Sequence, residues 1–229
     1  MKLIAHRGLS SQAPENTIKA FQLAALEESF FGIECDIHQT KDLEFVVFHD
    51  EDLNRMAKAF VKVEELTYEE LTQYPIKTGS KIKSYPNQLI PKLTDFLEIC
   101  EEYHKAAIIE IKKVQSIDQL IGLLNILENF PTTEIILISF NLSYLKFIRA
   151  ISPIKLQLLT DKVTDVLIYD LRVNQIDFSI QKDSFKPTLI PKLKKKGFEI
   201  ASFTVNKKSI VKQFSKLGID YITTDKILK

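Results

Sequence analysis

Residues 32–50 read GIECDIHQTKDLEFVVFHD, and this stretch carries the first evidence for the fold. Residues 33–37 and 45–48 are rich in β-branched and aromatic side chains, which favour strands. The eight residues between Asp36 and Phe45 are too few for a parallel crossover, which needs about a dozen or more. We therefore expect residues 37–48 to form a β-hairpin that returns His49 to the level of Asp36.

Short apolar runs typical of buried strands recur along the rest of the chain, with amphipathic stretches between them. Strands are expected at 3–5, 33–37, 107–111, 135–139, 155–159, 175–179, 199–203 and 219–223. Helices are expected at 15–28, 94–104, 116–129, 142–150, 162–171, 184–196 and 207–216. Alternating strands and helices predict a parallel α/β sheet, and eight strands in 229 residues predict a closed (β/α)8 TIM barrel. An open doubly wound sheet is the alternative, although the sequence lacks a GxGxxG or Walker loop.

Residues 51–91 interrupt this alternation with an irregular and polar segment that contains Pro75, Pro86 and Pro91. A long segment without periodicity inside a barrel is usually functional. We expect one catalytic barrel domain over 1–229, in which 51–91 is a small insertion or capping loop after the hairpin at the second strand.

Composition narrows the classes of partner. The formal net charge of +1 excludes bulk electrostatic attraction to nucleic acid or anionic membranes. No apolar run approaches the ~18 residues that span a bilayer, so we expect no stable membrane insertion. Cys35 and Cys100 form no paired motif and are expected to be reduced, which together with the lack of a signal peptide indicates a cytoplasmic location. The oligomeric state stays open.

Polar side chains gather where the predicted strands end. The residues concerned are His6, Arg7, Glu34, Asp36, His49, Glu110 and Lys112. Because the carboxyl ends of barrel strands open on one face, we expect these side chains to converge on one site.

The carboxylates in this group suit a metal ion. Glu34 and Asp36 lie two positions apart on one strand, so both point to the same side, which is the barrel axis if Cys35 faces the helices. Adjacent carboxylates repel unless a cation compensates. Glu110 supplies a third, and oxygen ligands of this kind suit Mg²⁺ or Ca²⁺. A solvated strand end, or a salt bridge to Lys112, is the alternative interpretation.

The histidines and cations of the group suit phosphate chemistry. His6 and His49 can act as general acid and base, because histidine titrates near neutral pH. Arg7 and Lys112 are suited to an anionic substrate such as a phosphate, or they balance the carboxylates. His38 and His104 are expected to be structural.

A set of motifs spans nearly the whole chain. It comprises His6-Arg7-Gly8, Pro14-Glu15-Asn16-Thr17 with Ala20-Phe21, Glu34-x-Asp36, Thr40-Lys41-Asp42, Val46-Val47-Phe48-His49-Asp50 with Leu53 and Arg55, Ile90-Pro91-x-Leu93, Ile109-Glu110-Ile111-Lys112, Ser139-Phe140 and residues 218–225. In order and spacing, the sequence resembles the glycerophosphodiester phosphodiesterase family. It departs from the family at Phe203, where tryptophan is frequent, and at Leu43, where the hairpin usually has glycine.

The resemblance implies a (β/α)8 barrel that hydrolyses glycerophosphodiesters, with a divalent metal, to sn-glycerol 3-phosphate and an alcohol. It implies that Glu34, Asp36 and Glu110 hold the metal, that His6 and His49 are the acid–base pair, and that Arg7, Lys112, Asn16, Phe140 and Phe203 bind substrate. A phospholipase C-like or lysophospholipase D-like enzyme acting on lipids, and a non-catalytic barrel that binds phosphodiesters, are the alternatives.

Overall fold

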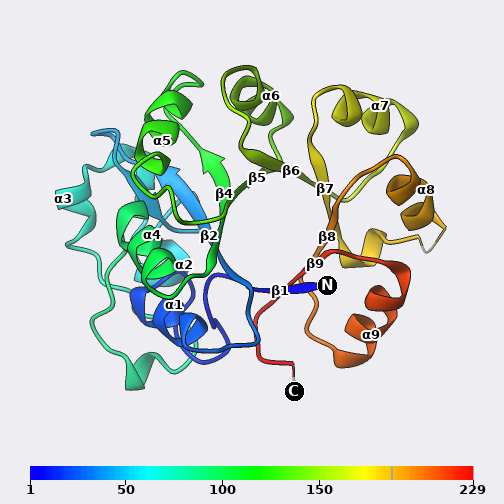
Figure 1. The fold of residues 1–229 in the computed structure, drawn as a ribbon. Helices are drawn as coiled ribbons and strands as arrows, with labels where there is room; N and C mark the ends of the chain where they lie inside the picture. The colour runs from blue at the N-terminus through cyan, green and yellow to red at the C-terminus, as the bar shows by residue number, and fades with distance from the viewer. Residues whose placement is uncertain (187, 229) are drawn as a thin grey trace.

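A ring of strands forms the centre of the molecule in the computed structural model, which describes residues 1–186 and 188–228 (Figure 1). The strands are β1 (Lys2–Ala5), β2 (Gly32–Gln39), β3 (Phe45–Val47), β4 (Ala106–Lys113), β5 (Ile135–Ser139), β6 (Lys155–Thr160), β7 (Asp177–Gln181), β8 (Ile200–Phe203) and β9 (Tyr221–Thr224). Their order is β1-β9-β8-β7-β6-β5-β4-β2-β3, and parallel pairing of β1 with β2 closes the ring. Within the described residues the closed ring is an eight-strand parallel barrel, as predicted.

Helices cover the outside of this ring (Figure 1). They are α1 (Ile18–Ala25), α4 (Leu93–Glu102), α5 (Gln119–Leu127), α6 (Leu142–Ile151), α7 (Asp165–Val173), α8 (Leu189–Lys195) and α9 (Lys208–Leu217). Most are shorter than their sequence patterns predict. Pro187, inside the predicted helix 184–196, and Lys229, at the end of the predicted domain, lie outside the described residues. None of the helices in the described part of the chain is both long and apolar enough to cross a membrane.

The predicted hairpin is present and sets the level of the site. β2 and β3 pair antiparallel with Ile37 opposite Val47. The backbone N–H of Phe48 donates to the carbonyl of Asp36 at 2.9 Å, so the chain comes back level with Asp36 just before His49. Leu43 occupies the turn with φ at 68°, a left-handed conformation that glycine adopts with less strain.

Side chains alternate between two cores along the barrel strands. Ile33, Cys35 and Ile37 are buried in the layer between strands and helices. Ile4, Ile108 and Ile136 belong to a second cluster of buried side chains. Since Ile108 is opposite Glu34 in the register of β2 and β4, and Cys35 takes the outer layer, Glu34 and Asp36 face the barrel axis.

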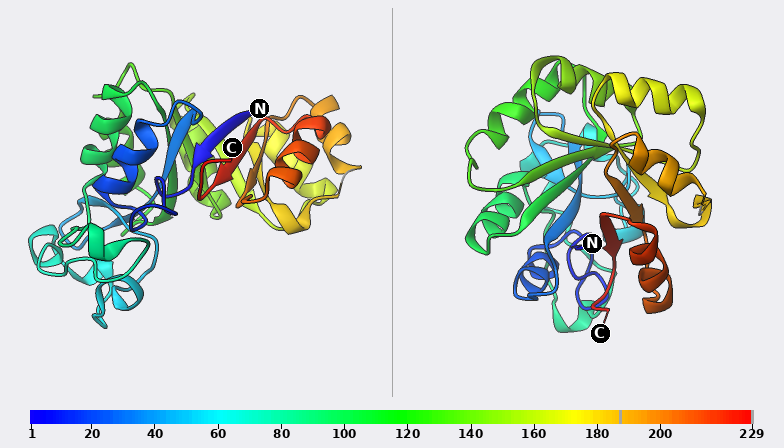
Figure 2. Two further views of the ribbon diagram at one scale, coloured as in Figure 1. Left: turned by 90° about the horizontal axis from the view of Figure 1, so that it is seen from below. Right: turned by 45° about the vertical axis from the view of Figure 1, so that its right-hand side comes forward.

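The segment 51–91 is more ordered than its sequence predicts. It forms the short helices α2 (Asn54–Ala57), η1 (Val63–Glu65), α3 (Tyr68–Leu71) and η2 (Ile82–Ser84). These pack around their own hydrophobic cluster, whose members are Val46, Phe48, Leu53, Met56, Ala57, Val63, Leu71, Ile76 and Ile90. Figure 2 shows this cyan segment as a lobe beside the barrel, near the blue helix α1. Val46 of β3 and Phe48, which follows β3, supply two of the side chains that fill the core of this lobe.

Candidate active site

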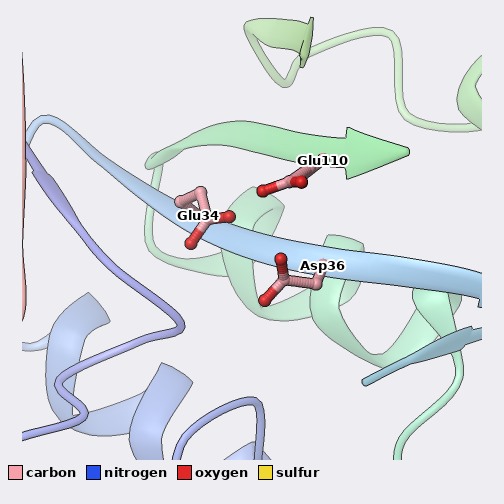
Figure 3. Close-up of side chains that lie close together, drawn as sticks. All are labelled: Glu34, Asp36 and Glu110. Atoms are coloured by element: carbon pink, nitrogen blue, oxygen red, sulfur yellow. The ribbon is translucent and has the colours of Figure 1, made fainter. Parts of the chain in front are cut away.

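Three buried carboxylates lie together on the neighbouring strands β2 and β4. One ligand atom each from Glu34, Asp36 and Glu110 lies within 4.8 Å of the others, and Figure 3 shows the three side chains from the two strands gathered in one place. Asp36 and Glu110 are direct neighbours in the strand register. At 1%, 0% and 8% exposure, respectively, these groups have almost no access to solvent.

The electrostatics of this cluster favour a bound cation. Burial, and then repulsion from Asp36, raise the pKa of Glu34 to about 8. The same causes raise the pKa of Glu110 to about 7. Among the described residues, Glu34 Oε1 and Asp36 Oδ1 have no hydrogen-bond partner. Buried carboxylate oxygens without donors are unusual in a folded protein, and a divalent cation is the partner that their chemistry fits.

Asp36 differs from its neighbours because cations and an amide surround it. Arg7 Nε lies 3.1 Å and Lys112 Nζ 3.7 Å from its carboxylate oxygens. Asn16 donates to Asp36 Oδ2 at 2.8 Å. Burial acts to raise the pKa of Asp36, but Arg7 and the other positive groups outweigh burial and lower it. Asp36 therefore stays ionised where Glu34 resists ionisation.

The loop after β1 carries Arg7, which contacts the carboxylate cluster through both its side chain and its backbone. Arg7 has φ at 55°, and its backbone N–H donates to Glu34 Oε2 at 2.8 Å. Asn16 is only 3% exposed, and its hydrogen bond to Asp36 supports that carboxylate. On β4, Lys112 donates to Glu110 Oε1 at 2.8 Å.

Each of the two strand-end histidines is held by a carboxylate through Nδ1. His6 Nδ1 lies 2.6 Å from Asp225 Oδ1, and His49 Nδ1 lies 2.7 Å from Asp50 Oδ1. Burial acts to lower the pKa of His6, but the hydrogen bond with Asp225 and the negative charges of Glu34 and Asp225 together outweigh it, and the pKa is raised. Burial dominates at His49, whose pKa is lowered.

A cavity of about 330 Å³ brings these groups together with two aromatic rings. Its lining residues are His6, Arg7, His49, Glu110, Lys112, Phe140, Gln181, Lys182, Phe203 and Thr204. Phe140 and Phe203 stand edge to face, with ring centroids 6.0 Å apart. The cavity thus combines an apolar wall, three cations and two imidazoles, and these groups can bind a phosphate ester and transfer protons during its hydrolysis.

Several residues of the site escaped the sequence reasoning. His6 is hydrogen-bonded to Asp225, which lies 219 positions further along the chain. Asn206 Nδ2 donates to Asp225 Oδ2 at 2.5 Å. Only the Thr-Thr-Asp end of the last strand hinted at Asp225. Asp50 is adjacent to His49 in sequence, so its position was visible but its role was not. His38 Nε2 contacts the carbonyl of His49 at 3.1 Å in a buried position, and His104 follows the end of α4.

Comparisons with known proteins identify the family of this chain. Residues 6–229 match the model of the glycerophosphoryl diester phosphodiesterase family. The glycerophosphodiester phosphodiesterase of Caldanaerobacter subterraneus subsp. tengcongensis is 31% identical over 97% of this chain and 93% of that protein. The glycerophosphodiester phosphodiesterase of Bacillus altitudinis is 31% identical over 98% of this chain and 94% of that protein.

Solved structures share the fold. An Oleispira antarctica phosphodiesterase in complex with the product sn-glycerol-3-phosphate aligns with a TM-score of 0.91 at 24% identity, covering 98% of this chain and 93% of that one. The glycerophosphodiester phosphodiesterase of Thermotoga maritima aligns with a TM-score of 0.80 at 25% identity, covering 99% and 95%. Fold and site define a TIM-barrel hydrolase. The chain belongs to the glycerophosphoryl diester phosphodiesterase family.

Proposed function

We propose that the protein hydrolyses glycerophosphodiesters to sn-glycerol 3-phosphate and an alcohol, with His6 and His49 as the acid–base pair. One observation carries this proposal. The two histidines, each held at Nδ1 by an aspartate, line the same cavity as Glu110 of the buried carboxylate cluster. The O. antarctica phosphodiesterase, whose fold this chain shares, is described with sn-glycerol-3-phosphate as its product.

The proposal includes a divalent cation, Mg²⁺ or Ca²⁺, held by Glu34, Asp36 and Glu110. Among the described residues, one buried oxygen each of Glu34 and Asp36 has no hydrogen-bond partner, and this supports the proposal, because hard cations prefer oxygen ligands. When bound, such an ion stabilises negative charge on the phosphoryl oxygens and lowers the pKa of a nucleophile.

The side chains around the cavity then have separate roles in the reaction. Arg7 and Lys112 bind the phosphodiester oxygens. The free hydroxyl of the glycerol unit attacks phosphorus while one histidine takes its proton, and the other histidine protonates the leaving alkoxide. Water opens the resulting cyclic phosphate with the two roles reversed. Direct attack by water is the alternative for a substrate that lacks the adjacent hydroxyl.

The two histidine environments favour one assignment of roles. A base must be unprotonated at working pH, and an acid must be protonated. The lowered pKa of His49 suits the base, and the raised pKa of His6 suits the acid. Phe140 and Phe203 offer an apolar wall for the carbon atoms of glycerol. A single catalytic domain, and a cytoplasmic location suggested by the free thiols of Cys35 and Cys100, complete the proposal.

The deciding assay measures release of sn-glycerol 3-phosphate from a panel of glycerophosphodiesters. The protein is stripped with EDTA and then supplied with Mg²⁺ or Ca²⁺. We expect turnover only after a metal is returned. Full turnover in EDTA contradicts the metal assignment, and no release from any member of the panel contradicts the substrate class.

A lipid-cleaving enzyme is the second candidate, and one observation favours it. Phe60 in the 51–91 segment is 90% exposed, between Lys58 and Lys62 in the sequence. Hydrolysis of lysophospholipid in mixed micelles that exceeds hydrolysis of water-soluble diesters, and that falls in Phe60→Ser, supports this candidate over the first.

A further inference from the structure

Arg55 connects the 51–91 lobe to residues that border the candidate active site. Arg55 lies on α2, and its guanidinium contacts two carboxylates. Its Nε donates to Asp50 Oδ2 at 2.7 Å, and its Nη2 donates to Asp50 Oδ1 at 3.1 Å. Its Nη2 also donates to Glu15 Oε1 at 2.6 Å, and its Nη1 to Glu15 Oε2 at 3.2 Å. Arg55 thus makes two bidentate pairs.

Both partners of Arg55 contact a residue of the proposed machinery. Asp50 holds His49 through Nδ1. Glu15 Oε1 accepts a second hydrogen bond, from Arg7 Nη1 at 2.8 Å. Arg7 in turn lies against Asp36. Hydrogen bonds and ion pairs therefore connect the His49 ring to Asp36 of the carboxylate cluster, by way of Asp50, Arg55, Glu15 and Arg7.

Contacts within the lobe hold the backbone of Arg55 and its neighbours in place. Its neighbours Met56 and Ala57 are buried in the hydrophobic cluster of the lobe. Thr78 Oγ1 donates to the carbonyl of Arg55 at 2.8 Å, and the backbone N–H of Lys77 donates to the carbonyl of Met56 at 2.8 Å. A guanidinium on a packed support can orient two carboxylates at once because its donors are planar and rigidly spaced.

We propose that Arg55 and Glu15 are positioning residues, which orient His49 through Asp50 and Arg7 through Glu15, so that the lobe completes the catalytic geometry. The inference rests on the proposed function. It differs from the expectation that residues 51–91 only cap the mouth. The exposure of Arg55, at 46% of its side chain, makes orientation and not stability its main contribution, since exposed ion pairs add little to folding.

The kinetic test compares Arg55→Ala, Arg55→Lys and Glu15→Gln with Arg172→Ala, a control at an exposed arginine on α7. We expect Arg55→Ala to lower kcat by about 10–100-fold, the usual cost of removing a group that orients a functional side chain, with KM changed by less than about threefold. Arg55→Lys keeps the positive charge and should recover only part of the rate, because an ammonium cannot form both bidentate pairs. Added methylguanidinium should restore part of the rate of Arg55→Ala and leave the control unchanged. A kcat for Arg55→Ala close to wild type, or a loss confined to KM, overturns the proposal.

A second test does not depend on catalysis. In ¹⁵N-histidine NMR of the protein without metal, Arg55→Ala should shift the Nδ1 signal of His49 and leave that of His6 in place. His6 is the internal control, because Asp225 and Asn206 hold it from β9 and the loop after β8. An unmoved His49 signal, or equal shifts of both signals, overturns the proposal. If the wild type releases no glycerol 3-phosphate, the proposed function fails, and the NMR comparison still decides whether Arg55 positions His49.

Discussion

At the scale of single residues, the carboxylates of the cluster are not equivalent. Burial and repulsion raise the pKa of Glu34 to about 8, whereas Arg7, Lys112 and Asn16 compensate the charge of Asp36. Replacing one or the other by its amide therefore has opposite consequences for the protein without metal, although both changes remove a proposed ligand.

We expect Glu34→Gln to raise the Tm of the EDTA-treated protein and Asp36→Asn to lower it. The first change removes a buried carboxyl that folding forces to stay protonated well above its ordinary pKa, and the second leaves Arg7 and Lys112 without their partner. A change of about 1 kcal/mol shifts Tm by roughly 2–4 °C in a protein of this size. Calorimetry measures the shifts, and isothermal titration should show that both variants lose affinity for Mg²⁺ or Ca²⁺. Unaltered metal affinity and full turnover in either variant contradict the ligand assignment.

His6 and His49 should also respond differently to the leaving group. We expect His6→Ala and His49→Ala each to lower kcat by about 10²–10⁴-fold, the usual contribution of a positioned acid or base. The losses should not multiply in the double variant, because either change already breaks the proton transfer. A nitrophenyl diester needs no general acid, so it should rescue His6→Ala and not His49→Ala. Rescue of the opposite variant reverses the roles, and near-normal turnover of both makes the pair structural.

At the scale of elements, local sequence patterns predicted the structural features that depend on residues close together in the chain. The hairpin β2–β3 follows from the short span between Asp36 and Phe45, and the inward direction of Glu34 and Asp36 follows from strand parity. The small core of residues 51–91 could not be predicted in this way. Its apolar side chains are widely spaced, without helical or strand periodicity, and they become a core only when Val46 and Phe48 of the hairpin segment join them.

The same limit applies to the partners of the histidines. His6 and Asp225 are 219 positions apart, and only closure of the barrel brings them together. Arg55 and Glu15 are 40 positions apart, and the pairing depends on how the lobe packs. Candidate site residues that share one strand could be predicted from the sequence. The residues on other elements that orient them could not.

The lobe should affect both preference and rate when it is exchanged. Residues 51–91 replaced by the corresponding segment of a relative should change the order of kcat/KM among head groups. We expect kcat to be kept where the new segment retains an arginine in the place of Arg55, and to fall by about 10–100-fold where that arginine is changed to alanine. Steady-state kinetics on the two chimaeras check this. Equal kcat values with and without the arginine contradict the positioning role.

At the scale of the whole molecule, the opposite end of the barrel carries its own charged cluster. Lys155, Glu199 and Tyr221 are joined by hydrogen bonds and an ion pair there. Asp177 begins β7 beside them, and its Oδ1 accepts from the backbone N–H of Glu199 at 2.8 Å. Burial raises the pKa of Asp177 to about 6. The ionised carboxylate therefore lowers the stability of the folded state at neutral pH.

We expect Asp177→Asn to stabilise the fold at neutral pH. The folded pKa is raised, so the folded state binds the proton more tightly. The contribution of Asp177 to stability is therefore complete below about pH 4, its ordinary pKa, and is lost as pH rises through about 6. The variant should gain about 1–2 kcal/mol at pH 7.5, after allowance for solvent screening, and little at pH 4.5. Urea unfolding at both values measures it, and an equal gain at the two pH values contradicts this origin.

The bond between His6 and Asp225 joins the first strand of the barrel to the last. Contacts between distant parts of a chain form slowly, because a large loop must close before they stabilise anything. During refolding, strands and helices can therefore return before His6 has its partner. We therefore expect activity to return only when the seam between β1 and β9 closes, so that the recovery of activity during refolding reports on this late step.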